Sequence, residues 1–118
     1  FAIPVADFSK TSKLSFKTNA GYYNGDVLKV YWSTNYNPAS PTSATLNDIT
    51  SQFDISKGKV PPGTGSNYED SFRGSGIGSL PTGTTGAGYI IFEYNSNHST
   101  ANPSGISTVM QLDDINVF

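Results

Sequence analysis

The stretch VLKVYWS, residues 27–33, decides the fold class of this chain. Its residues alternate with a period of two, which is typical of a β-strand with one buried face. Lys29 assigns one face to solvent, because a charged side chain is rarely buried without a partner. The opposite face then carries the residues that we expect in the core: Leu28, Val30 and Trp32.

Other stretches predict further strands around this one. Residues 14–18 (LSFKT) alternate, residues 89–94 (YIIFEY) are a dense run of β-branched and aromatic residues, and residues 109–118 alternate imperfectly around two acids. Residues 68–72 predict a short strand, and residues 46–50 fit a helical turn or a strand equally well. No helical period extends over ten residues. The sequence therefore predicts five or six strands in an all-β, antiparallel β-sandwich.

Length and composition limit the function classes. At 118 residues, we expect a single domain spanning 1–118. Charged residues make up 14% and the net charge is −2, so neither nucleic acid nor direct membrane insertion is expected. Cysteine is absent, which excludes a disulfide framework. Abundant Gly, Ser, Thr and Asn with few charges favour an exported protein, secreted or held on the outer cell surface.

Four motifs occur in the order PVADFSKTSKLSFKTN, NGDVLKVYWSTNYN, GYIIFEYNS and STVMQLDDINVF. In order and spacing this resembles the choice-of-anchor J and cleaved-adhesin group of jelly-roll modules. The resemblance implies a jelly-roll-like sandwich from a secreted or surface bacterial protein, often a lipoprotein. Members usually carry a further N-terminal section, so the resemblance is compatible with a sandwich that lacks N-terminal strands. An exposed sheet edge would then favour a homodimer or a partner strand.

The acidic residues raise two questions, catalysis and metal binding. Two adjacent pairs, Glu69-Asp70 and Asp113-Asp114, should point to opposite faces of a strand, which does not suit a catalytic couple, and the single His98 has no evident partners. We therefore expect no enzymatic activity. The resemblance implies a structural calcium at Asp113, with Asp26, Glu69 and Asp70 as companions, because calcium prefers carboxylate and carbonyl oxygens. The alternative is an acid that is only hydrogen-bonded to backbone amides.

Tyrosines supply the candidate ligand-binding residues. Sugars bind by stacking on aromatic faces while polar side chains read their hydroxyls. The loop and solvent-facing candidates are Tyr22, Tyr23, Tyr31, Tyr36 and Tyr68. We expect a non-catalytic adhesion or ligand-binding module whose partner is a glycan or a cell-surface protein, with carbohydrate as the preferred ligand class. The alternative is a structural spacer domain in which these tyrosines only pack under long loops.

Overall fold

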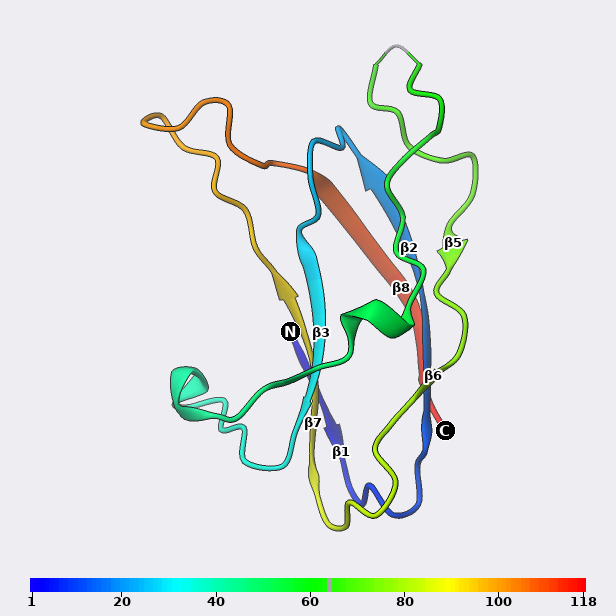
Figure 1. The fold of residues 1–118 in the computed structure, drawn as a ribbon, viewed down its shortest axis with the longest axis vertical. Helices are drawn as coiled ribbons and strands as arrows, with labels where there is room; N and C mark the ends of the chain where they lie inside the picture. Colours follow the sequence, from blue (N-terminus) through cyan, green and yellow to red (C-terminus); the bar gives the residue numbers. More distant parts are fainter. Residues whose placement is uncertain (64) are drawn as a thin grey trace.

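A computed structural model describes residues 1–63 and 65–118 as a sandwich of two antiparallel sheets (Figure 1). This confirms the all-β prediction. No helix in the described part of the chain is long and apolar enough to cross a membrane. The short helical pieces are two 3₁₀ turns, η1 (Pro41–Ser43) and η2 (Thr50–Gln52).

The first sheet has the order β1-β7-β3-β4. Its strands are β1 (Ala2–Val5), β7 (Gly88–Tyr94), β3 (Leu28–Ser33) and β4 (Asn47–Asp48). The two longest of these, β3 and β7, pair along their whole common length, from Leu28 opposite Tyr94 to Ser33 opposite Tyr89. The run of residues 27–33 thus supplies a central strand, as its alternation predicts.

The second sheet is organised around β2 (Lys13–Gly21). On one side β2 pairs with two short strands, β5 (Arg73–Gly74) and β6 (Gly78–Ser79). On the other side it pairs with β8 (Val109–Val117) over almost its entire length. The strand β8 is therefore an edge of this sheet, and β1 is the corresponding edge of the first sheet.

The core lies between the inner faces of the sheets. Phe16 of β2 is at its centre, with its ring 4.9 Å from that of Phe53 and 5.2 Å from that of Phe92. The expected core residues Leu28 and Val30 are buried, and Trp32 packs against the core from a half-buried position. The remaining buried members are Val5, Phe8, Leu14, Ile49, Leu80 and Ile90.

The segment 49–56, which contains η2, closes one side of the sandwich; we call this side the closed flank. It follows β4 of the first sheet, and Gln52 bonds to β6 of the second sheet. The Gln52 side chain donates to the Ser79 carbonyl at 3.1 Å and accepts from the Ser79 amide at 2.8 Å. In Figure 1, η2 lies in front of the sheets, between β3 and β6. Residues 46–50 thus form both a strand and the start of a helical turn.

Three strand predictions need correction. The described residues form eight strands rather than five or six, because three of the strands contain only two residues and the four-residue β1 was not predicted. The strand predicted at 68–72 is absent, and pairing with β2 occurs instead at Arg73 and Gly74. At residue 69, the Asn19 side chain exchanges hydrogen bonds with the backbone of Glu69. These side-chain bonds take the place of backbone pairing between two strands. The strand predicted at 14–18 continues to Gly21.

The acids of β8 also differ from expectation. The register of β2 with β8 shifts between Ser15 and Lys17, which marks a β-bulge. Asp114 takes a positive φ of 49° there, so it and Asp113 are both exposed instead of pointing to opposite faces. The bulge keeps the apolar residues before and after it on the core side of the strand.

Candidate functional site

One end of the sandwich is built from the turn after β2 and the loop 57–68. The Tyr22 amide donates to the Ser66 carbonyl at 2.7 Å, and the Lys59 amide donates to the Asn67 carbonyl at the same distance. Gly58 has a positive φ of 77°, and a Cβ there would lie 2.8 Å from the Asn67 carbonyl oxygen. This glycine therefore lets the loop fold closely onto the turn.

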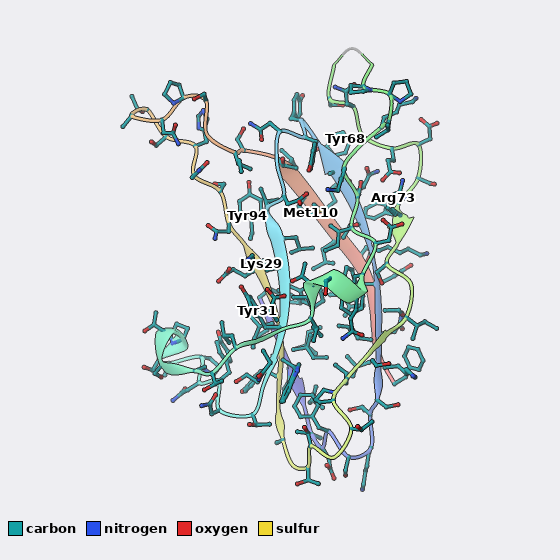
Figure 2. The ribbon with its side chains drawn as sticks, in the orientation of Figure 1. Lys29, Tyr31, Tyr68, Arg73, Tyr94 and Met110 are labelled. Atoms are coloured by element: carbon teal, nitrogen blue, oxygen red, sulfur yellow. The ribbon has the colours of Figure 1, made fainter. Side chains whose placement is uncertain are left out.

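Tyr68 is fixed at this end by the backbone beneath its ring. A Cβ added at Gly21 would lie 2.2 Å from the Tyr68 ring, so only glycine accommodates the ring there. Tyr22 meets the Tyr68 ring edge-on, with centroids 6.4 Å apart. Figure 2 shows Tyr68 beside the upper end of β2. Tyr68 thus packs onto the sheet end, and Tyr22, which is exposed, packs against it.

Tyr23 is oriented by charged neighbours. Its hydroxyl donates to the Asp26 carboxylate at 2.7 Å, and this bond raises the pKa of Tyr23 and lowers the pKa of Asp26. The Lys57 ammonium lies 3.4 Å from the same carboxylate and 5.8 Å from the centre of the Tyr23 ring. Both the tyrosine hydroxyl and its ring are therefore held in place at neutral pH.

A pocket with a volume of about 300 Å³ opens beside Tyr23; we call it the Tyr23 pocket. Its lining is mainly apolar and combines one aromatic ring, two aliphatic side chains, two lysine side chains and one amide, from Tyr23, Val60, Pro62, Lys57, Lys59 and Asn67. The Asn67 side-chain oxygen is buried and accepts no hydrogen bond from the described residues. A buried acceptor of this kind favours a ligand that can donate.

The other two predicted tyrosines lie elsewhere. Tyr31 is on β3, and its hydroxyl donates to Glu93 of the neighbouring strand at 3.3 Å (Figure 2). Burial is the main cause that raises the pKa of Tyr31. Tyr36 packs edge-on against Tyr89, 5.2 Å between centroids, and lines a broad hollow with Pro4. The structure therefore brings together Tyr22, Tyr23 and Tyr68 but not all five tyrosines.

The four carboxylates predicted for calcium have different partners. Asp26 bonds to Tyr23 and Lys57, and Asp70 pairs with Lys59 at 3.2 Å. Asp113 accepts from the amide of Asp114 at 2.8 Å, which matches the backbone-capping alternative. Within residues 1–63 and 65–118, no three acidic or histidine side chains come close enough to hold one ion. The four carboxylates therefore do not form one shared set of ligands, and calcium binding stays a prediction.

Glu69 belongs to a hydrogen-bonded cluster that the sequence does not reveal. Its carboxylate accepts two bonds from Arg73, at 2.6 and 3.1 Å, and one from the Ser56 hydroxyl. These bonds, with that to Arg73 as the largest cause, lower the pKa of Glu69. Ser56 is buried, and its oxygen also accepts from the amides of Ala20 and Gly58. The cluster therefore anchors the segment 54–73 to β2.

Sequence reasoning selected Tyr23 but missed the rest of its pocket. Lys57, Lys59 and Asn67 lie in a stretch rich in Gly, Pro and Ser that has no periodicity. The only usable signal was a pair of lysines next to Val60 and two prolines.

Comparison with known proteins does not add to this description. No family model, no curated protein and no solved structure matches the chain. The resemblance to the choice-of-anchor J group therefore stays a prediction based on the four motifs.

Proposed function

We propose that this chain is a non-catalytic binding module of an exported protein and that it holds a carbohydrate in the Tyr23 pocket. The observation that carries the proposal is the composition of the pocket: one oriented aromatic ring and a mainly apolar lining, with two lysine side chains and one amide, around a space of about 300 Å³. Such a combination suits a sugar, whose ring has apolar faces and whose edge has hydroxyls.

The polar groups complement sugar hydroxyls in both directions. The ammonium groups of Lys57 and Lys59, which pair with Asp26 and Asp70, have further N–H groups to donate, while the buried oxygen of Asn67 has no donor among the described residues. Val60 is 80% exposed, so a ligand that covers it also removes apolar surface from water. The volume is at the small end of ligand pockets, which favours a single sugar unit or a chain end.

The test is ligand-observed NMR of the chain with a panel of monosaccharides and oligosaccharides. We expect binding by at least one sugar, and Tyr23→Ala should weaken it at least about tenfold because the stacking surface is lost. Tyr36→Ala is the matched control, since it removes a tyrosine of the other hollow and should leave binding unchanged.

Two results would contradict the proposal. If the panel gives no binding, the spacer alternative gains, in which the tyrosines only pack the loops. If Tyr36→Ala abolishes binding while Tyr23→Ala does not, the site lies at the hollow beside Tyr89 instead. Circular dichroism of each variant shows whether a loss of binding reflects a loss of fold.

A further inference from the structure

The side of the sandwich opposite η2 is formed by the edge strands β1 and β8; we call it the open flank. Figure 1 draws both strands faintly, on the side of the molecule that lies away from η2. The nine residues of β8 pair with β2 on one side. Among the strands that the structure describes, none pairs with the other side of β8. A long strand with one unpaired side is a template for another strand.

The hydrogen bonds of β2 show which backbone groups of β8 are unpaired. The amides of Phe16 and Ala20 turn away from β8, toward the hydroxyls of Ser75 and Ser56 at 2.9 Å. In an antiparallel pair, residues that face each other either exchange two hydrogen bonds or both turn away. Met110, which lies opposite Ala20, therefore directs its own amide and carbonyl toward the open flank.

The backbone groups of β8 alternate in direction along the whole strand. Lys13 and Phe118 exchange two bonds, at 2.8 and 3.0 Å, so the next residue, Val117, turns its backbone outward. The direction of the backbone groups alternates on each side of the bulge, which adds Leu112 and Ile115 to Met110 and Val117. The residues of β8 that present backbone groups to the open flank are Met110, Leu112, Ile115 and Val117.

These four residues also have apolar side chains, and each is only half-buried. All four pack against the core, as does the half-buried Ile3 of β1 on the other edge. A strand placed beside β8 would cover them and would bring its own alternate side chains into contact with the core. Its inward residues would thus have to be apolar.

The outward residues of β8 indicate which side chains the outer face of the partner strand should carry. Apart from the exposed Val109 at the start of the strand, they are polar or acidic, with Gln111, Asp113 and Asn116 exposed. Asp114 already has a partner in Lys17 at 2.7 Å, whereas Asp113 is bonded to the amide of Asp114. Lys or Arg on the incoming strand would therefore complement Asp113, since opposite charges on neighbouring strands attract.

In the register that covers all four half-buried residues, a second copy of this chain fits the edge poorly. Antiparallel pairing of two β8 strands, with Met110 opposite Val117 and Leu112 opposite Ile115, would place the two acids of one copy against those of the other. Like charges opposite each other destabilise a sheet. We propose that the open flank instead receives a strand of a partner protein, which adds to β8 with apolar residues at alternate positions and Lys or Arg between them.

The experiment uses the capped peptide TVKVKIKVT as the probe and amide hydrogen exchange of the intact chain, measured by NMR, as the readout. We expect the peptide to slow exchange at Met110, Leu112, Ile115 and Val117 at least about tenfold, because these amides gain hydrogen-bond partners. The scrambled peptide TVVKKKVIT should have no such effect.

A charge exchange tests the predicted chemistry of the partner. Asp113→Lys should weaken binding of the lysine peptide and strengthen binding of its glutamate counterpart TVEVEIEVT; this substitution lies at an exposed position, so the fold should persist. The proposal is overturned if neither peptide protects β8. It is also overturned if the free chain already protects these amides and sediments as a dimer, because the occupant is then a second copy.

Discussion

The two flanks of this sandwich enclose the same core in different ways. On the closed flank, Phe53 packs its ring against Phe16 and over the backbone of Gly78, where a Cβ would lie 2.3 Å from the ring. Backbone and side-chain bonds from Gln52 and Asp54 then join this segment to the second sheet. On the open flank, the described chain places only strand edges and half-buried side chains.

This difference means that the closed flank contributes mainly to stability and the open flank mainly to recognition of a partner. A flank covered by an aromatic ring and several hydrogen bonds contributes to folding, although a pocket of about 230 Å³ lined by Phe53 and Met110 still opens there. A flank with unpaired backbone groups next to apolar side chains contributes less to folding and can bind a strand. The Tyr23 pocket is a third region, at the end of the sandwich, so a sugar and a strand could be bound without competing for the same residues.

The largest expected effect is on the closed flank. Phe53→Ala should lower the free energy of unfolding by about 3–5 kcal/mol, because it leaves a cavity against Phe16. Leu112→Ala on the open flank should cost only about 1 kcal/mol, since the half-buried side chain loses less contact. Urea denaturation measures both. Equal losses would contradict the comparison, because they would mean that the open flank is as tightly sealed as the closed one.

A smaller effect is expected from the buried serine behind the closed flank. Ser56→Ala removes the acceptor of the Ala20 and Gly58 amides, and we expect a loss of about 2 kcal/mol because two backbone donors lose their partner. The exposed Ser51 provides a control, Ser51→Ala, which should change stability little. A Ser56 variant as stable as the wild type would show that the cluster does not anchor the segment 54–73.

The smallest effect depends on pH. Folding lowers the pKa of Glu69 below its ordinary 4.5, mainly through Arg73, so ionised Glu69 stabilises the fold above that pH. The stabilisation is lost as pH falls through the lowered pKa. Glu69→Gln should therefore cost about 1 kcal/mol at pH 7 and almost nothing in acid well below the lowered pKa. A thermal unfolding series between pH 7 and 2 checks this, and a cost that is independent of pH would contradict it.

Alternation was sufficient to predict the long strands. In β7, Ile90 and Phe92 are buried on the inner face, and Glu93 lies on the other face. Tyr94 shares the inner face but stays 53% exposed, because its hydroxyl reaches the Thr108 carbonyl at the rim. The strands β5 and β6 could not be predicted, since two residues show no period.

The candidate site was less predictable from the sequence, because most of its residues meet only through a particular backbone conformation. Tyr23 could be selected because an aromatic residue beside a turn is conspicuous in a sequence. Asn67 and Lys59 reach the same pocket only because Gly58 lets the loop fold onto the turn, and that approach depends on backbone conformation. The burial of Ser56 had no signal at all, because serine is usually exposed.

Hydrogen exchange along β8 in the free chain tests the central comparison most directly. We predict that the exchange rates alternate along the strand. The amides of Gln111 and Asp113, directed toward β2, exchange slowly, while those of Met110 and Leu112 exchange at least about tenfold faster. If all four amides are equally slow in a monomer, the edge of β8 is not free, and the distinction between a closed and an open flank is wrong.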